Sequence, residues 1–444
     1  MRYIPITPEI ESEMLNKMGI SSLEELIKII PDSLRLKDEL GLNDPLSELE
    51  LLNRSKAISN SNDEASNGIN FLGGGAYDHF IPSVVDFLSG RSEFYTAYTP
   101  YQAEVSQGTL QVMYEFQSMI CELSGMDVAN SSLYDGASAV AEACSMSLSV
   151  TRRKKVFLSG LLNPAYIQVV ETYLQNRQAE IVILPNKNGR TDLCSINFDE
   201  DDIACIVIQS PNYYGIIEDW CEAAEKLKGK KGLLVAVGNP LDMVLLKSPG
   251  ESGAHIYVGE GQALGNPISF GGPHMGLMAT RSNLMRKMPG RIAGKTTDID
   301  GKEGFVLTIQ TREQHIRREN ATSNICTNQA LLALRSTIYL SLLGKENIHS
   351  LVKLCFDKAH YLAEKITDIA GFGIPFGTEF IKEFVVSTPI SAKRLVEDAC
   401  EEGIFFSTVD GDDSDRLILI AVTEKRTKED MDQFIKYLKK YRVN

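Results

Sequence analysis

The sequence lacks the marks of a membrane-spanning, secreted or metal-binding protein. No apolar run in its 444 residues approaches the roughly 18–20 residues that a spanning helix needs. The first residues, MRYIPITPEIESEM, have no basic stretch followed by an apolar core, so they do not predict a secretory signal. The eight cysteines include no C-x-x-C pair, which favours reduced thiols in a cytoplasmic protein. The six histidines show no ligand spacing, and we expect no metal site.

Positive charge is also scarce. Lysine and arginine together number 45 against 59 aspartates and glutamates, which gives a net charge of −14. An acidic surface repels phosphate backbones and anionic lipid headgroups. We therefore expect neither nucleic acid nor a membrane as the main partner.

The chain is long enough for two domains and an extension. Residues 1–68 predict a helical arm that ends in a linker rich in serine and asparagine, 59–68. Residues 69–327 predict a large α/β domain, because short apolar strands alternate with helices from about residue 130 onward. That alternation is typical of a mainly parallel sheet covered on both faces. A long helix then opens a small C-terminal α+β domain, 328–444.

One predicted strand and turn lacks the lysine that its pattern would place there. Residues 255–276, HIYVGEGQALGNPISFGGPHMG, read as a buried strand followed by a glycine-rich turn. In many enzymes that use pyridoxal phosphate, such a segment carries the lysine that binds the cofactor. The nearest lysines here are Lys247, before the strand, and Lys287, well after it.

Two glycine-containing segments could lie close to a ligand. Gly136, Ala137 and Ser138 begin a helix, where free backbone N–H groups suit a phosphate; a closely packed helix start is the alternative. The triple glycine Gly73–Gly75 fits neither a dinucleotide fingerprint nor a phosphate loop. We expect it to allow close approach of a neighbouring chain or a ligand.

The segment FYTAYTPYQAEVSQG, residues 94–108, is unusual in its tyrosines and threonines. Tyr95, Tyr98 and Tyr101 stand beside Thr96 with few aliphatic neighbours, which is poor core material. Aromatic rings with hydroxyl groups suit a pocket wall or an interface. A plain surface loop is the alternative.

The segment QTREQHIRRENATSNICT, residues 310–327, contributes three arginines. Arg312, Arg317 and Arg318 indicate either a solvated helix face or a site for an anionic ligand or carboxylate. His274 in GGPHMG is expected to be hydrogen-bonded to the backbone of its own turn.

Four segments, FYTAYTPYQAEVSQGTLQ, GASAVAEA, GEGQALGNPISFGGPHMG and QTREQHIRRENATSNICT, together resemble the glycine cleavage P-protein family. They match its N-terminal half, which in some bacteria is a separate chain called subunit 1. The resemblance covers essentially the whole sequence. It implies the fold-type I fold of pyridoxal-phosphate-dependent transferases, with a mainly parallel large domain and a small C-terminal α+β domain.

In that family only subunit 2 has the cofactor lysine. The resemblance places Gln262 at or near the lysine position, and Val237 or Gly238 where cofactor enzymes usually have an aspartate facing the ring nitrogen. An amide cannot form a Schiff base, and an apolar residue cannot keep the ring protonated. The resemblance therefore implies a vacated site with a vestigial phosphate cup, Gly136–Ser138, and pyridoxal phosphate bound covalently by the partner subunit.

The function implied is that of glycine decarboxylase in the glycine cleavage system. Subunits 1 and 2, with two copies of each expected in the complex, would decarboxylate glycine and pass its aminomethyl group to the lipoyl arm of the H-protein. Tyr95, Thr96 and Tyr98 are expected to reach across the interface into the partner's site. Asn320 departs from the family, which more often has lysine there.

Two other functions are compatible with the sequence. The chain could be an independent pyridoxal phosphate enzyme of aminotransferase type that uses Lys247 or Lys295. It could also be a purely structural or regulatory partner that contributes nothing to the neighbouring pocket.

Overall fold

The computed structural model describes residues 5–36, 40–62, 68–199, 202–321, 323–410 and 414–443. The chain forms two compact units, Met1–Asp63 and Glu64–Asn444. Residues 63–67 of the predicted linker lie outside the described residues, and the three-part division of the chain remains a prediction. Within the described ranges, no helix combines the length and apolarity needed to cross a membrane.

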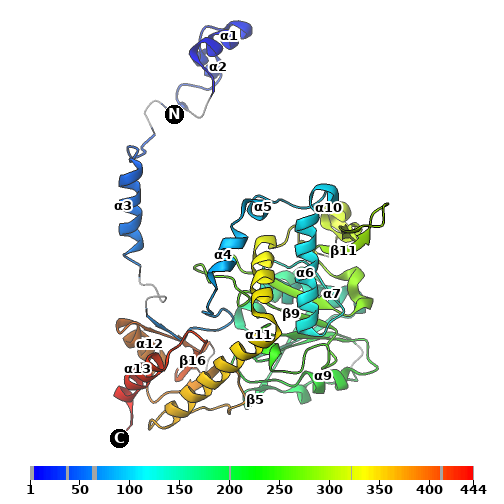
Figure 1. The fold of residues 1–444 in the computed structure, drawn as a ribbon, viewed down its shortest axis with the longest axis vertical. Helices are drawn as coiled ribbons and strands as arrows, with labels where there is room; N and C mark the ends of the chain where they lie inside the picture. Colours follow the sequence, from blue (N-terminus) through cyan, green and yellow to red (C-terminus); the bar gives the residue numbers. More distant parts are fainter. Residues whose placement is uncertain are drawn as a thin grey trace. The chain divides into compact units, whose positions relative to one another are not determined.

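The first unit is helical, as its sequence predicts. It contains α1 (Pro8–Met18), α2 (Leu23–Ile27) and α3 (Glu48–Ser59), which Figure 1 shows in blue. The Thr7 side chain caps α1 by accepting from the Ile10 N–H. None of the three helices buries a residue, so their apolar side chains have no core of their own.

The second unit is built on a seven-stranded sheet with the order β2-β10-β9-β8-β7-β3-β4. The five strands from β9 to β4 run parallel, whereas β10 is antiparallel to both of its neighbours. The strands are β2 (Val128–Ala129), β3 (Lys155–Ser159), β4 (Glu180–Leu184), β7 (Ile203–Gln209), β8 (Leu233–Val237), β9 (Ile256–Glu260) and β10 (Gly276–Thr280). Strands β3, β7, β8 and β9 are buried apolar runs, which is why the sequence alone located them, whereas the edge strand β4 is partly exposed.

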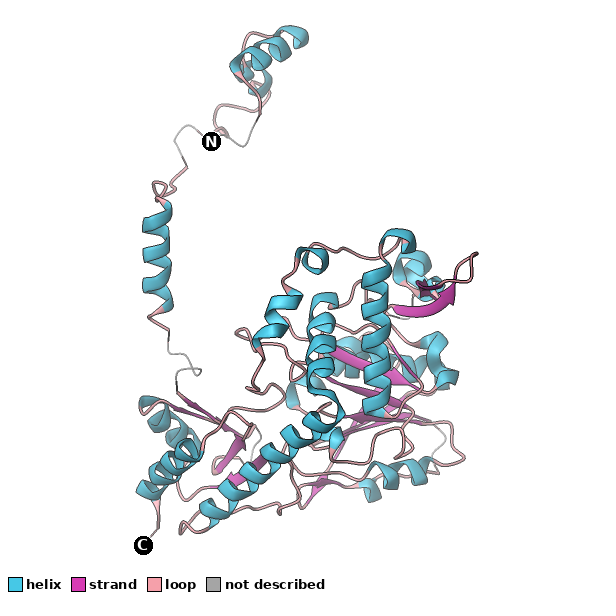
Figure 2. Cartoon of the chain, viewed as in Figure 1, coloured by secondary structure: helices cyan, strands magenta, loops and turns pink. Residues whose placement is uncertain are grey.

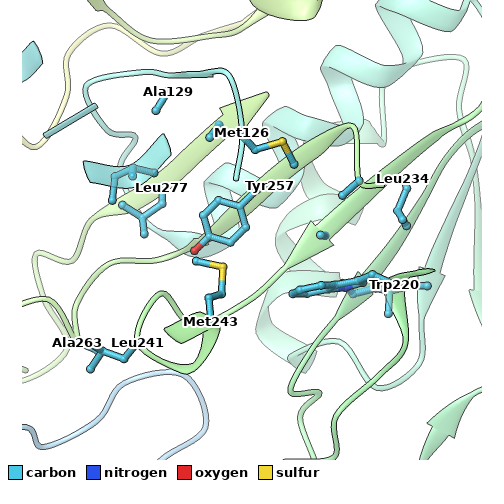
Figure 3. Close-up of a cluster of buried hydrophobic side chains, with 14 of the residues drawn as sticks. Met126, Ala129, Trp220, Leu234, Leu241, Met243, Tyr257, Ala263 and Leu277 are labelled. Atoms are coloured by element: carbon cyan, nitrogen blue, oxygen red, sulfur yellow. The ribbon is translucent and has the colours of Figure 1, made fainter. Parts of the chain in front are cut away.

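Helices cover both faces of this sheet (Figure 2). On β9, Tyr257 packs into one core and Val258 into the other, because successive strand residues point to opposite faces. The Tyr257 side also contains Trp220 (Figure 3). Residues of α6, α9 and α11 cover this side. The Val258 side is covered by α7 and α8. These helices are α6 (Gln107–Ser124), α7 (Gly136–Thr151), α8 (Pro164–Leu174), α9 (Trp220–Leu227) and α11 (Ala330–Thr367).

The C-terminal part has its own core and a three-stranded antiparallel sheet, β13-β16-β15. The sequence of residues 404–408 predicts one strand, but the structure splits it in two: β14 pairs parallel with β1, while β15 pairs with β16. Two different partner strands cause the break, and the local sequence holds no sign of either. The elements are β1 (Ile69–Asn70), β13 (Glu383–Ser387), β14 (Ile404–Phe405), β15 (Ser407–Thr408), β16 (Leu417–Ala421), α12 (Ala392–Glu401) and α13 (Lys428–Leu438).

Helix α11 connects the two parts of this unit and is longer than predicted. The sequence suggested an end at Gly344, but there the backbone only kinks, with φ of 63°, and the helix continues to Thr367. The remaining short elements are α4 (Ser83–Ser89), α5 (Ser92–Tyr95), α10 (Gln314–Arg317) and the hairpins β5 (Asn186–Lys187) with β6 (Arg190–Thr191) and β11 (Ile292–Thr297) with β12 (Glu303–Thr308).

Candidate functional site

Gln262 lies in the turn directly after β9, and its side chain is 2% exposed. Its Oε1 accepts from the Tyr77 N–H at 2.8 Å, and its Nε2 donates to the Tyr77 carbonyl at 3.1 Å and to the Asn266 carbonyl at 2.8 Å. The amide is thus fully used in holding two loops together. A side chain engaged in this way, without an amine, offers nothing to a carbonyl cofactor.

A small cavity lies beside Gln262, at the ends of β8 and β9. Its volume is about 40 Å³, and Tyr77, Val237, Gly238, Glu260 and Lys382 are among the residues that line it. Such a volume holds a few water molecules. Pockets for cofactor-sized ligands occupy roughly 300 Å³ or more.

The start of α7, which the sequence marked as a phosphate cup, is already occupied by carboxylates of this chain. The Gly136 N–H donates to Glu260 Oε2 at 2.8 Å, and the Ser138 N–H donates to Asp135 Oδ1 at 2.7 Å. Glu260 Oε1 also accepts from two further backbone N–H groups, those of Gln262 and Met275, both at 3.0 Å. These carboxylates stand where the negative charge of a phosphate would bind a helix N-terminus.

Burial raises the pKa of the Glu260 carboxyl to about 7, against the opposing effect of its three backbone donors. Glu383 behaves alike: burial raises its pKa to about 7, although the Gly74 N–H at 2.6 Å and the Tyr77 hydroxyl at 2.9 Å donate to it. Two carboxyl groups of this cavity therefore titrate near neutral pH. Neither stood out in the sequence, because each belongs to an ordinary apolar strand.

The triple glycine does make a close approach, but to the chain's own Glu383. A side chain at Gly73 would collide with Glu383 Oε1 and with Ala421. The Gly74 carbonyl in turn accepts from Asn163 Nδ2 at 2.8 Å. The sequence predicted a neighbouring chain or a ligand at this segment, whereas the groups it approaches among the described residues belong to the same molecule, Glu383 and Ala421 to its C-terminal part.

The cavity contains a lysine that sequence reasoning missed. Lys382 is 1% exposed; its Nζ lies 2.5 Å from Asp242 Oδ1 and 4.5 Å from the centre of the Tyr77 ring. Lys382 lies far along the chain from β9, so no local pattern could connect the two. An ammonium held by a buried carboxylate is a structural ion pair and a poor nucleophile.

The lysines of the alternative enzyme hypothesis lie elsewhere. Lys247 Nζ lies 3.5 Å from Cys221 Sγ, in a groove that it shares with Trp220, and Lys295 on β11 pairs with the exposed Glu303. Neither lines the cavity beside Gln262. In the described residues, this cavity therefore does not fit a covalently bound pyridoxal phosphate: the amide, the apolar Val237 and the carboxylate in the cup all oppose it.

The tyrosine segment is exposed. Tyr95 is 67% and Tyr98 86% exposed, and the Thr96 hydroxyl donates to the Ser92 carbonyl at 2.6 Å. Tyr95 and Tyr98 line a second, open cavity of about 250 Å³, and Arg291 also lines it. These rings do not line the cavity beside Gln262. Neighbouring aromatic rings that are this exposed are typical of a surface that binds another protein or a ligand.

Buried Arg291 fixes the end of the tyrosine segment, because its Nη2 donates to the Tyr101 hydroxyl at 3.2 Å. Arg312 also makes an internal contact: its Nη2 donates to the Gly290 carbonyl at 2.5 Å. Burial lowers the pKa of Arg312 to about 10. Arg317 donates to the Thr311 carbonyl at 3.0 Å, and Arg318 follows in a left-handed backbone conformation. Arg312, Arg317 and Arg318, the three arginines that the sequence singled out, therefore do not converge on one anion.

Two smaller predictions can be compared with the structure. His274 Nε2 lies 3.3 Å from the Ile268 carbonyl, which confirms that the backbone of its own turn holds this ring. Asn320, where the family more often has lysine, is exposed, and its Nδ2 donates to Glu319 Oε1 at 3.2 Å. Its amide thus makes a local contact with its neighbour.

Comparisons with known proteins agree with this geometry. A family model described as "Glycine cleavage system P-protein" matches residues 1–438. "Probable glycine dehydrogenase (decarboxylating) subunit 1" of Chloroherpeton thalassium is 47% identical over 440 residues, covering 99% of each chain. The protein of the same name from Chlorobium phaeobacteroides is 48% identical over 441 residues, again covering 99% of each.

Solved structures agree as well. A crystal structure of glycine decarboxylase (P-protein) of the glycine cleavage system, in inhibitor-bound form, superposes with a TM-score of 0.91 at 39% identity. The match covers 99% of this chain and 100% of that one. A glutamate decarboxylase of Lactobacillus brevis shares the fold alone, with a TM-score of 0.67 at 13% identity over 92% of this chain and 95% of that one. The predicted fold-type I architecture is confirmed.

Proposed function

Because this chain belongs to the glycine cleavage system P-protein family, we propose that it is subunit 1 of a glycine decarboxylase whose catalytic cofactor is held by a partner chain, subunit 2. The observation that supports the proposal lies at the end of β9. Gln262, which we assign to the lysine position, is held by Tyr77, and Glu260 accepts from the Gly136 N–H at the start of α7. The chain would thus keep the fold while its own cofactor site is closed.

In the proposed assembly, the two subunits together decarboxylate glycine and hand the remaining aminomethyl group to the lipoyl arm of an H-protein. Pyridoxal phosphate in subunit 2 supplies the electron sink for the loss of carbon dioxide. This chain supplies no step at its own cavity. Two copies of each subunit would give every cofactor site one neighbouring copy of this chain.

The contribution of this chain would come from its exposed tyrosines. Tyr95, Thr96 and Tyr98 carry hydroxyl groups on a segment that Arg291 fixes at Tyr101. Placed against the partner's pocket, the hydroxyls of Tyr95 and Tyr98 could donate to the glycine carboxylate, and all three side chains could line the path of the lipoyl arm. Such positioning has large effects on rate, because it replaces a bimolecular encounter by a fixed geometry.

The exposed apolar side chains of α4 and the residues around it support a role in assembly. Phe80, Phe87, Tyr95 and Tyr98 are each more than half exposed. Burying them against a partner would remove apolar area from water, and obligate interfaces typically bury more than about 2,000 Å². We expect subunit 1 to co-purify with subunit 2 as a stable complex.

The test is co-expression with a subunit 2 chain, followed by an assay of glycine–bicarbonate carboxyl exchange with lipoylated H-protein present. We expect exchange from the complex and none from either chain alone. Exchange by this chain alone, with its own lysine-bound cofactor, would favour the alternative of an independent pyridoxal phosphate enzyme. Full exchange by subunit 2 alone would reduce this chain to a structural or regulatory partner.

A further inference from the structure

Three side chains with metal-ligating atoms meet within the second unit, next to the loop that Gln262 holds. His79 follows the triple glycine, Cys355 lies on α11, and Glu424 follows β16. Their ligand atoms all lie within 4.8 Å of one another. His79 Nδ1 is 2.7 Å from Glu424 Oε2, and the Cys355 thiol donates to the same oxygen at 3.4 Å. The His79 and Glu424 side chains are 3% and 11% exposed, and Cys355 is buried.

The contacts among these groups do not satisfy the polar atoms around them. His79 Nε2 is buried without a hydrogen-bond partner among the described residues, and so is the hydroxyl of Tyr339. Burial raises the pKa of Tyr339, and the negative charges of Glu424 and then Cys355 add to the rise, so these groups are neighbours. Buried polar atoms left over around one cluster call for a water or an ion.

The donor set itself selects a class of ion. A thiolate sulfur, an imidazole nitrogen and a carboxylate oxygen are the three ligand types that zinc uses in proteins. With Cys355 and Glu424 ionised and His79 neutral, two negative charges offset the two positive charges of the ion. The buried site would then carry no net charge, which removes the main cost of placing ions in an apolar interior.

We propose that His79, Cys355 and Glu424 bind a divalent metal ion of the zinc class, which ties α11 and the C-terminal part of the chain to the segment that carries Tyr77. The second carboxylate oxygen, Glu424 Oε1, is already oriented by the Phe80 N–H at 2.5 Å. Lys358 Nζ donates to the Glu424 carbonyl at 2.6 Å. Contacts of this kind orient the ligands of metal sites.

Burial raises the pKa of the Cys355 thiol, and the charge of Glu424 raises it further, so the metal-free protein keeps this thiol protonated. Binding releases that proton to solvent. The competing interpretation is a plain ion pair between His79 and Glu424. An ion pair gives the Cys355 thiol only a hydrogen bond to the same carboxylate and leaves His79 Nε2 unsatisfied.

The spacing explains why sequence inspection predicted no metal site. His79 and Glu424 are 345 residues apart, and Cys355 and Glu424 are 69 apart, so no local histidine or cysteine motif exists. The site would be structural, because its three ligands lie in the interior and none lines the cavity beside Gln262. It is independent of the proposed function, and its test needs neither subunit 2 nor glycine.

The test uses the purified full-length chain. Metal content is measured by mass spectrometry after purification without chelators and after refolding with zinc, and we expect about one ion per chain. Cobalt(II) is then added to the metal-free protein, where thiolate ligation produces a near-ultraviolet charge-transfer band. We expect Cys355→Ser to abolish the band and His79→Gln to weaken cobalt binding at least tenfold. Cys144→Ser, which alters a thiol just as buried but in the opposite core, should leave both unchanged.

Circular dichroism establishes that each variant is folded. If Cys355→Ser does not fold, the stoichiometry of the wild type and the cobalt affinity of His79→Gln decide the question. A wild-type chain that binds no stoichiometric zinc would overturn the proposal. So would a charge-transfer band that survives in folded Cys355→Ser.

Discussion

The side chain of Gln262 and the backbone of Tyr77 are joined by two hydrogen bonds, one in each direction, at 2.8 and 3.1 Å. This amide fastens the loop that follows the first strand of the second unit, β1. The same loop is fixed a second time through the Tyr77 hydroxyl, which donates to Glu383. Gln262 is thus part of the packing between the two parts of the second unit.

Restoring the lysine should not restore the cofactor. We expect Gln262→Lys to show no visible absorbance from a Schiff base with pyridoxal phosphate, because Glu260 occupies the start of α7 and neither Val237 nor Gly238 offers the ring nitrogen an acidic partner. The variant should also lose at least about 2 kcal/mol of stability, since the Tyr77 N–H is left without an acceptor. Absorbance spectra and urea unfolding measure the two effects.

The matched control is Gln262→Met, which has nearly the same length but no charge. It should be destabilised less than Gln262→Lys, because it buries no ammonium. A lysine variant that gains a borohydride-stable adduct would show that the rest of the site is still competent.

The stability of the chain should fall with rising pH through the titration of Glu260. Its pKa in the folded protein, about 7, lies above the ordinary value of 4.5, so its contribution is fully present below pH 4.5 and is lost as pH rises through about 7. We expect Glu260→Gln to flatten the decline between about pH 4.5 and 7, by up to about 3 kcal/mol.

Urea unfolding at several pH values measures this difference in slope. Glu346→Gln, which changes an exposed carboxyl, should retain the wild-type slope. Parallel curves for Glu260→Gln and the wild type would mean that Glu260 keeps an ordinary pKa in its nest of backbone donors.

Breaking the buried ion pair in the cavity should be costly. Asp242→Ala leaves the Lys382 ammonium buried without its partner, and we expect a loss of about 3–5 kcal/mol in the free energy of unfolding. The double variant Asp242→Leu with Lys382→Met should recover most of that loss, because it removes both charges. A single variant as stable as the wild type would show that water reaches Lys382.

The exposed tyrosines should affect turnover without affecting assembly. Tyr95→Phe and Tyr98→Phe each remove one hydroxyl, and a lost hydrogen bond to a charged group is worth roughly 1.5–3 kcal/mol, about tenfold to a hundredfold in rate. We expect slower glycine–bicarbonate exchange by the complex, with unchanged co-purification. Tyr361→Phe, whose hydroxyl contacts Asp432 in the C-terminal part, serves as the control. Wild-type exchange rates in both test variants would make the segment a packing surface only.

Much of this fold could be predicted from local patterns. The strands that became β3, β7, β8 and β9 are apolar runs between turn residues, and each formed close to its predicted bounds. The inference that this chain does not bind the cofactor covalently came from the absence of a lysine in the strand and turn 255–276. Patterns of this kind lie within a few neighbouring residues, so one sequence is enough to recognise them.

The parts that were missed depend on residues far apart in the chain. Glu260 is the last residue of an apolar strand, and only the fold brings it to the N–H of Gly136. The same holds for Lys382 beside Asp242 and for the break between β14 and β15. Each is decided by tertiary neighbours, which a single sequence does not display.

The most direct measurement is to reduce the active complex of this chain and subunit 2 with borohydride and to map the pyridoxyl label by peptide mass spectrometry. Reduction fixes the cofactor to whichever lysine binds it. We predict a label on a lysine of subunit 2 and none on this chain. A stoichiometric label on a lysine of this chain, whether Lys382, Lys247 or Lys295, would contradict the conclusion that its own site is closed.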